Sequence, residues 1–212
     1  MILITEIRPR KRTKLFEVYS EAGLEFLANE KFLNGNDILL HAQFDDEDFE
    51  LIRAKAHLLD GIRKSIDILS RKDYSKKELL QKLCDKGILE DAAHSAIQYM
   101  IDHGYQDDFR YAKRLAELNA QLYGRRRTEQ MLYNHGIDKE MIREVCDEVF
   151  DDTEKEEDKI DLLLEKAARG KDLSDPKERN KVFAKLARFG YESSVISAAF
   201  SRYKANRKDE TP

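Results

Sequence analysis

One pattern occurs three times in this chain, as Lys82-Leu-Cys-Asp-Lys-Gly-Ile88, Met131-Leu-Tyr-Asn-His-Gly-Ile137 and Lys185-Leu-Ala-Arg-Phe-Gly-Tyr191. The glycines are 49 and 54 residues apart, with a leucine four residues before each and a large apolar residue directly after. Glycine readily adopts the left-handed conformation that ends many helices, and the next apolar side chain then folds back over the last turn. Each segment therefore predicts the end of a helix.

Two more helices belong to each copy of the pattern. Apolar residues recur at positions five, six, nine, ten and thirteen after each glycine, which is the spacing of one helical face. Another helical pattern precedes the glycine helix of each copy: Ile62, Ile66 and Leu69; then Tyr111, Leu115 and Leu118; then Ile160, Leu163, Leu164 and Ala167. Each copy thus predicts three helices.

Several helix starts are marked in the sequence. Ser75-Lys-Lys-Glu78 is a capping box, and Asp175-Pro176-Lys-Glu178 combines an N-cap, a first-turn proline and an acid. The acids of Asp45–Glu50 suit the positive end of a long helix that runs to about Ser70. The acidic stretch Asp151–Asp158 fits either a hinge or the solvated start of a helix.

The expected fold is mainly α, with three tandem three-helix repeats in an elongated, curved arrangement behind a small β-prone N-terminal segment. Within that segment three short stretches are β-prone and Glu21-Ala-Gly23 suits a turn, which predicts a hairpin or meander. The β-prone stretches are Ile2–Ile7, Lys14–Ser20 and Leu24–Leu27. The predicted division is a leader at 1–44, repeats at 45–106, 107–153 and 154–206, and a tail at 207–212.

Charge is segregated along the 212 residues, although the net charge is only −4. Basic residues are in excess in 53–86, 110–137 and 162–208, whereas 138–161 holds twelve acids against four bases. Cys84 and Cys146 lie in apolar-periodic segments without metal or redox spacing, so we expect small buried hydrophobes and a reducing cytoplasm. No stretch approaches the roughly 18 apolar residues of a membrane helix.

Three motifs together resemble the RecX family of regulatory proteins. They are Asp73-Tyr-Ser-Lys-Lys-Glu-Leu-Leu-Gln-Lys-Leu83 with Lys86-Gly87, Gly104-Tyr-Gln-Asp-Asp-Phe-Arg-Tyr-Ala112, and Gly124 with the basic helix that leads to Leu132-Tyr-Asn-His-Gly-Ile137. The resemblance covers about residues 45–205. It implies a partner, the RecA recombinase, whose filament the protein would restrain from its helical groove, with neither catalysis nor a cofactor. Several members are basic, so the acidity of this chain favours filament binding over tight DNA binding.

Two clusters of bases are the candidate binding residues. Arg110, Lys113 and Arg114 together with Arg125-Arg126-Arg127 could contact phosphates or an acidic patch, or could simply form a solvated helix face. A second cluster could bind a partner or keep an exposed strand edge soluble. It consists of Arg8, Arg10, Lys11, Arg12 and Lys14.

Other polar and aromatic residues favour structural roles. Asp107-Asp108 suits helix capping better than a metal or acid/base pair, and we expect Tyr74, Tyr105 and Tyr111 to pack between helices rather than stack on bases. The five histidines share no metal-binding spacing, and no phosphate loop or nucleophile elbow is present. The sequence therefore predicts no metal, no cofactor and no enzyme.

Three functions remain open at this point. The first is a monomeric modulator, most simply an inhibitor, of the RecA filament. The second is a helical DNA-binding protein with Arg125–Arg127 near the groove in helix-turn-helix fashion. The third is a general protein-interaction scaffold. Weak contact with single- or double-stranded DNA is compatible with the first.

Overall fold

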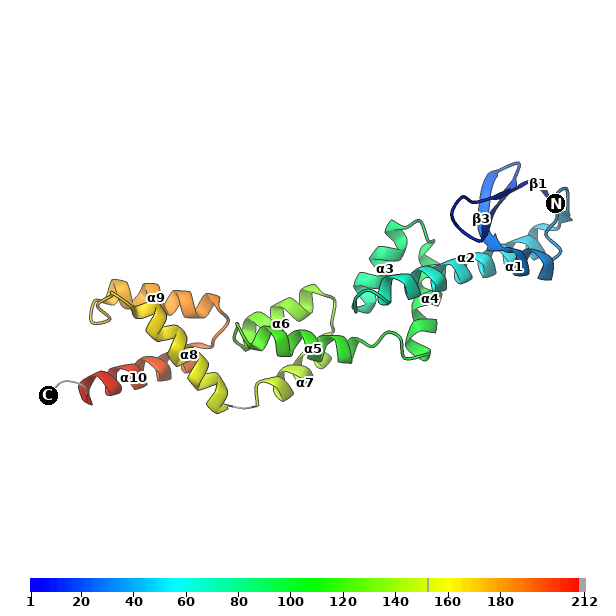
Figure 1. Cartoon of the computed structure of the whole chain (residues 1–212). Coiled ribbons are helices and arrows are strands. Elements are labelled where there is room, and N and C mark those ends of the chain that lie inside the picture. The colour runs from blue at the N-terminus through cyan, green and yellow to red at the C-terminus, as the bar shows by residue number, and fades with distance from the viewer. Residues whose placement is uncertain (152, 210–212) are drawn as a thin grey trace. The chain divides into compact units, whose positions relative to one another are not determined.

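The computed structural model describes the backbone of residues 1–151 and 153–209 and the side chains of residues 1–151 and 157–205. Within the described residues the chain forms ten helices and four strands, and it divides into two compact units, Met1–Asp107 and Asp108–Pro212. The mainly α fold with a small N-terminal sheet is as predicted (Figure 1).

The first unit begins with an antiparallel sheet of strand order β3-β2-β1-β4. Its strands are β1 (Ile2–Pro9), β2 (Leu15–Ser20), β3 (Gly23–Asn29) and β4 (Gln43–Phe44). The meander of the first three strands confirms the expectation for the leader. The short helix α1 (Glu30–Gly35), which Asn29 caps through a 2.8 Å bond from Phe32 N–H, and strand β4 were not predicted.

Helix α2 (Asp46–Leu69) belongs to two cores. Its N-cap is Asp45, whose carboxylate accepts from Asp48 N–H at 2.8 Å, and it ends before Ser70 as expected. Its first half packs on the sheet through Phe49, in a core with Ile4, Val18, Phe26 and Ile38. Its second half contributes Ile68 to the core of the first repeat. The predicted boundary at residues 44 and 45 therefore precedes a helix that the leader and the first repeat share.

The three-helix pattern recurs three times along the chain. The first repeat joins α2 to α3 (Lys76–Asp85) and α4 (Glu90–Asp102). The second consists of α5 (Asp108–Ala120), α6 (Arg125–Asn134) and α7 (Lys139–Val149). The third consists of α8 (Thr153–Ala168), α9 (Pro176–Arg188) and α10 (Ser193–Asp209). The helical part of Asp151–Asp158 favours the second alternative, a helix start, while residue 152 lies outside the described residues.

Each repeat glycine ends the middle helix of its repeat, as predicted. Gly87, Gly136 and Gly190 have φ values of 78°, 83° and 93°. In the first repeat, Gly87 N–H donates to the carbonyl of Cys84 at 2.8 Å and Ile88 N–H donates to that of Leu83 at 3.1 Å. This pair of bonds defines a Schellman motif. The other two repeats form the same pair of bonds, and the leucine before each glycine is buried.

Two apolar residues expected on the buried face of the first helix of a repeat are exposed. Ile66 in α2 is 50% exposed and Leu118 in α5 is 56% exposed. In α2 the buried face carries Gly61 and Ser65 instead, because α4 approaches so closely that a Cβ on Gly61 would lie 3.0 Å from that of Ala96. In α5 it carries small residues as well, namely Ala112, Ala116, Asn119 and Ala120.

The expectations for the tyrosines and cysteines are met in most cases. Tyr74 packs against the core of the first repeat and Tyr111 is buried in that of the second. The expectation for Tyr105 was wrong, because its side chain is 58% exposed. Cys146 is buried and Cys84 partly buried, and both are free thiols. In the described part of the chain, no helix combines the length and apolar character needed to cross a membrane.

Candidate partner-binding surface

Arg125 links two helices of the second repeat. Its guanidinium donates to the carboxylate of Glu129 on the same helix at 2.8 Å and to that of Asp147 on α7 at 2.6 Å. Burial alone would lower the pKa of Arg125, but these two carboxylates outweigh it, and the pKa is raised. Arg125 therefore serves the packing of α6 on α7.

Arg127 contacts the end of α9 in the third repeat. Its guanidinium donates to the backbone carbonyl of Arg188 at 3.2 Å and lies 3.8 Å from the ring centroid of Tyr123. The Tyr123 ring in turn contacts that of Phe189, with 6.0 Å between centroids. Stacking of arginine on an aromatic face in this way adds attraction between the π system and the cation. Arg127 thus helps to join the second and third repeats.

The backbone completes this junction, in which the start of α6 meets the end of α9. The N–H of Gly124 donates to the carbonyl of Phe189 at 2.9 Å, and the N–H of Arg126 donates to that of Gly190 at 3.1 Å. The first amides of a helix and the last carbonyls of another have no partner within their own helices, and here they satisfy one another. The side chain of Arg126 stays 62% exposed, with Glu192 at 3.6 Å.

The bases of α5 are on the surface of the same repeat. The ammonium of Lys113 lies 2.6 Å from the carboxylate of Glu148, and this hydrogen bond raises the pKa of Lys113. Arg110 and Arg114 are exposed. The two predicted groups of bases on α5 and α6 therefore belong to one repeat, but Lys113, Arg125 and Arg127 bond within the protein at 3.2 Å or less. Arg110 and Arg114 also have interactions within the protein.

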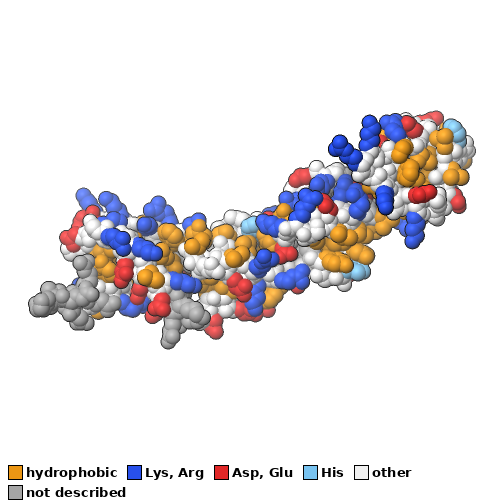
Figure 2. All heavy atoms as spheres, viewed as in Figure 1, with side chains coloured by type: hydrophobic (Ala, Val, Ile, Leu, Met, Phe, Trp, Pro, Cys, Tyr) orange, Lys and Arg blue, Asp and Glu red, His pale blue; other side chains and the backbone are white. Residues whose placement is uncertain are grey.

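The N-terminal cluster surrounds the turn between β1 and β2. Arg8 pairs with Glu6 at 2.6 Å, and Arg10 lies 3.8 Å from Glu17. The remaining bases of the cluster, Lys11, Arg12 and Lys14, are exposed at the tip of the hairpin and have no ion-pair partner among the described residues. This cluster belongs to the first unit and the bases of α5 and α6 to the second. In Figure 2, cationic and anionic side chains are mixed over the visible face rather than gathered into a single field.

A hollow between α6 and α7 brings further bases together with Arg125 and Arg126. Its volume is about 460 Å³, and Lys139 and Arg143 of α7 also line it, together with Gln130 and Tyr133 of α6. These four residues were not among the binding residues predicted from the sequence. Lys139 and Arg143 lie in the acid-rich stretch 138–161, so a count of charges along the chain concealed them, and comparison of equivalent positions in the three repeats was the signal that could have found them.

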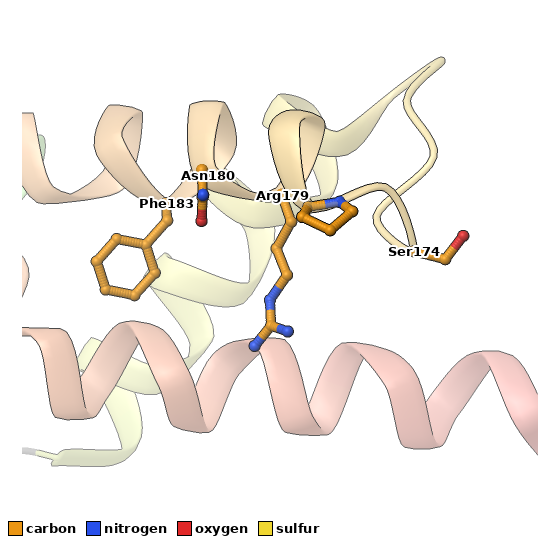
Figure 3. A pocket seen from close by; sticks show the side chains of 5 residues that line it. Ser174, Arg179, Asn180 and Phe183 are labelled. Atoms are coloured by element: carbon orange, nitrogen blue, oxygen red, sulfur yellow. The ribbon is translucent and has the colours of Figure 1, made fainter.

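A second hollow, of about 320 Å³, lies beside α9 in the third repeat. Its lining includes Arg179, Asn180 and Phe183, which are 54 residues after Arg125, Arg126 and Glu129. In Figure 3 the side chain of Arg179 reaches from α9 toward α10. Its guanidinium carbon is 5.6 Å from the ring centroid of Phe200 on α10. The two hollows therefore share three equivalent positions, but one is strongly basic and the other contains a single charged side chain.

No group of three His, Cys, Asp or Glu side chains in the described residues could hold a metal ion. Asp108 is the first residue of α5 and Asp107 directly precedes it, where a capping role would place them. That role stays a prediction.

Comparisons with known proteins match the first repeat and the chain as a whole. The family model described as RecX, first three-helix domain, matches residues 62–100, which reach from the second half of α2 to α4. The regulatory protein RecX of Stenotrophomonas maltophilia is 32% identical over 143 residues, which are 67% of this chain and 85% of that protein. The chain belongs to the RecX family. Its RecX relative in Vibrio campbellii is 32% identical and is covered over 95% of its length.

Solved structures of RecX proteins share the fold. A crystal structure of regulatory protein RecX has a TM-score of 0.67 at 19% identity and covers 95% of this chain and all of the other. RecX from Lactobacillus salivarius has a TM-score of 0.63 at 21% identity, over 70% of this chain and 97% of that one. The relatives named regulatory protein RecX support a regulatory role for the chain.

Proposed function

We propose that this protein binds the filament of the RecA recombinase and modulates it, acting as an inhibitor of filament growth, ATPase activity and strand exchange. The observation that carries the proposal is the similarity to proteins named regulatory protein RecX over 85% to 95% of their length. The proposed role is regulatory and needs neither a cofactor nor a catalytic group. The partner is RecA, and the protein acts as a monomer.

The repeats suggest how such binding would gain strength. Three similar helical modules in one chain can each contact a polymer of identical subunits, and every contact raises the effective concentration of the next. Several weak contacts then give firm binding without a single large interface. Bases and acids that alternate over the surface suit a protein partner that also presents both signs.

The DNA-binding alternative gains little from the geometry of α6. A recognition helix inserts its N-terminal residues into the major groove. Here the first turn of α6 is hydrogen-bonded to the end of α9, and the side chains of Arg125 and Arg127 bond within the protein. The general scaffold alternative predicts no preference for a recombinase. Selective retention of RecA by the immobilised protein, with an unrelated filament-forming protein as the control, would favour the RecA modulator over the general scaffold.

The decisive experiment is a titration of the DNA-dependent ATPase of RecA. The recombinase is assembled on single-stranded DNA at fixed salt, and the protein is added at ratios well below one per RecA subunit. We expect a dose-dependent fall in ATP hydrolysis at these low ratios. Unchanged hydrolysis at equal molar amounts, together with salt-sensitive binding to duplex DNA alone, would replace the proposal with the DNA-binding function.

A further inference from the structure

The turn between α1 and β4 exposes two adjacent leucines, and its residues 37–42 are called the dileucine turn below. Leu39 is 63% exposed and Leu40 is 53% exposed, although turns usually carry glycine or short polar residues. Single apolar side chains are common on protein surfaces, but two in succession at a turn form a small apolar protrusion. Neither leucine belongs to the core that the sheet shares with α2. The packing of the leader therefore gives no reason for them.

The backbone of the dileucine turn is fixed on both sides of the leucines. Ile38 anchors it in the core of the leader and is 1% exposed. The N–H of Ala42 donates to the carbonyl of Leu39 at 3.0 Å, which closes the turn. The N–H of His41 donates to the carbonyl of Ile4 on β1 at 2.9 Å, and the N–H of Ile4 donates to that of Ala42 at 2.9 Å. An ordered backbone therefore holds the two leucines on the surface.

The same backbone is strained. Asp37 and His41, on either side of the leucines, have φ values of 50° and 65°, in the left-handed region where the side chains of L-residues are crowded. Glycine adopts these angles without that cost, yet neither position carries one. Strained residues persist where the surrounding structure enforces them, and they are concentrated at ligand-binding and switch regions. Strain thus indicates a functional role for the turn, independently of the exposure of its leucines.

The segment that contains the turn carries negative charge only. Residues 32–52 contain six acids and no lysine or arginine. Among these acids, Asp37 and Glu47 are exposed and form no ion pair with any described residue. The basic cluster of the leader lies beyond the other end of β1, at the turn to β2. The acids repel phosphate, which argues against a nucleic acid or an anionic membrane over the leucines. They favour a protein surface on which bases surround an apolar pocket.

We propose that Leu39 and Leu40 dock into an apolar pocket on a RecA subunit, where lysine or arginine side chains at the rim of the pocket face the acids of residues 37–50. This inference rests on the proposed function and specifies one of its contacts. A turn that already has its bound shape loses little conformational entropy on binding, so a small contact can be strong. Because the leader and the repeats share one chain, this contact also raises the effective concentration of the others.

Binding of the whole chain to RecA filaments tests the proposal. RecA is assembled on single-stranded DNA with a slowly hydrolysed ATP analogue, and the protein is immobilised through its C-terminus. The main variant combines Leu39→Ser with Leu40→Ser. We expect its affinity for the filament to fall by roughly tenfold or more, because a few buried anchor residues carry most of the binding energy of an interface. Leu39→Met with Leu40→Met keeps the apolar volume and should bind within about threefold of the unchanged protein.

A matched control makes the same change at two exposed leucines outside the leader. Leu89 and Leu162 are each 57% exposed. Leu89→Ser with Leu162→Ser should keep the affinity within about twofold. Equal weakening by both double variants would overturn the proposal, since binding would then follow surface hydrophobicity alone. Circular dichroism verifies the fold, and the single change Leu40→Ser, which should weaken binding about threefold or more, carries the same test if the double variant does not fold.

The acids near the turn give an independent readout. If they face bases on RecA, higher salt should weaken binding, and Asp37→Asn with Glu47→Gln should make binding less sensitive to salt. The control Glu140→Gln with Glu144→Gln removes two exposed acids of α7 and should leave the salt dependence unchanged. Equal salt dependence in all three proteins would contradict the basic rim of the pocket and overturn the proposal.

The binding measurement also separates failure of this inference from failure of the proposed function. If the unchanged protein does not bind RecA filaments, both are wrong. If it binds and the variant with serine at both leucine positions binds equally well, only the inference is wrong. Vesicles of anionic phospholipid provide the remaining comparison, and we expect no binding to them. Binding to these vesicles that both serine substitutions abolish would assign the leucines to a membrane surface and overturn the proposal.

Discussion

Gly124 and Gly190 lie backbone against backbone where the second repeat meets the third. A Cβ on Gly124 would come within 2.7 Å of the carbonyl carbon and oxygen of Gly190, and a Cβ on Gly190 would come within 2.5 Å of that of Arg127. Gly190 also has a φ of 93°, which L-residues rarely adopt. Gly190 therefore ends α9 and, at the same time, leaves room for the backbone at Gly124.

We expect Gly124→Ala to lower the free energy of unfolding by about 1 to 3 kcal/mol, because the added methyl group has no space and must push two backbones apart. Gly190→Ala should cost more, because left-handed strain of about 1 to 2 kcal/mol adds to the same crowding. Urea unfolding followed by circular dichroism measures both changes.

Two glycines serve as controls for these variants. Gly87→Ala introduces left-handed backbone strain without crowding, since no atom lies within 4 Å of its added Cβ. Gly35→Ala introduces neither backbone strain nor crowding. The predicted order of destabilisation is Gly190, then Gly124 or Gly87, then Gly35. A Gly124→Ala variant as stable as Gly35→Ala would contradict the close packing of the junction.

The capping box of α3 gives a second prediction. The Ser75 hydroxyl accepts from Glu78 N–H at 3.2 Å, and the Glu78 carboxylate accepts from Ser75 N–H at 3.2 Å. Ser75→Ala should lower the free energy of unfolding by about 1 kcal/mol, because it leaves a helix-terminal amide without its acceptor. Chemical denaturation provides the measurement.

Ser95→Ala is the matched control for the cap. The Ser95 hydroxyl donates to the carbonyl of Asp91 within α4 and is exposed, so its removal should change stability by less than about 0.5 kcal/mol. If both variants lost the same stability, the cap at Ser75 would contribute nothing beyond an ordinary surface serine.

The repeat glycines show why so much of the fold was predictable from the sequence. A helix end with left-handed backbone strongly prefers glycine, so Gly87, Gly136 and Gly190 mark three ends without further information. The buried faces were less predictable where small residues form them. Hydrophobic periodicity gives weight to Ile66 and none to Gly61, yet close approach of α4 depends on the glycine.

The candidate site was predictable only in part, because its partners are distant in the sequence. The run Arg125–Arg127 is visible as a basic cluster, but the bonds to Asp147 and to the carbonyl of Arg188 depend on how three helices meet. A count of charges along the chain likewise cannot find Lys139 or Arg143, because the stretch 138–161 that contains them is rich in acids. Helical spacing and comparison between repeats are needed to place such bases.

Cys146 gives a prediction for the pH dependence of stability. Burial, with a smaller contribution from the negative charge of Glu129, raises the pKa of this thiol from 9.0 to about 11. A pKa raised on folding means that the folded state holds the proton more tightly. The contribution of the protonated Cys146 thiol to the free energy of unfolding is therefore complete below about pH 9 and is lost as the pH rises through about 11. This contribution amounts to roughly 2 to 3 kcal/mol.

Comparison with Cys146→Val isolates this effect from the titration of other groups. Ile97 and Phe200 are the equivalent residues of the other repeats, so an apolar side chain suits the position. Between about pH 8 and pH 11, the unchanged protein should lose more stability than the variant. Parallel losses in the two proteins would show that Cys146 does not titrate with the shifted pKa.

The junction between Gly124 and Gly190 also bears on the proposed inhibition of RecA. If several repeats contact one filament, each contact raises the effective concentration of the next, and this gain is largest when the repeats are held in the geometry that matches the filament. Gly124→Ala should disturb the junction and leave the cores of the second and third repeats intact, because Gly124 belongs to neither. We therefore expect the concentration that halves the ATPase activity of RecA to rise several-fold, while the helical content by circular dichroism stays unchanged. Gly35→Ala should inhibit as the unchanged protein does. Full inhibition by a Gly124→Ala variant whose junction amides exchange rapidly with solvent would mean that the two repeats act independently on the filament.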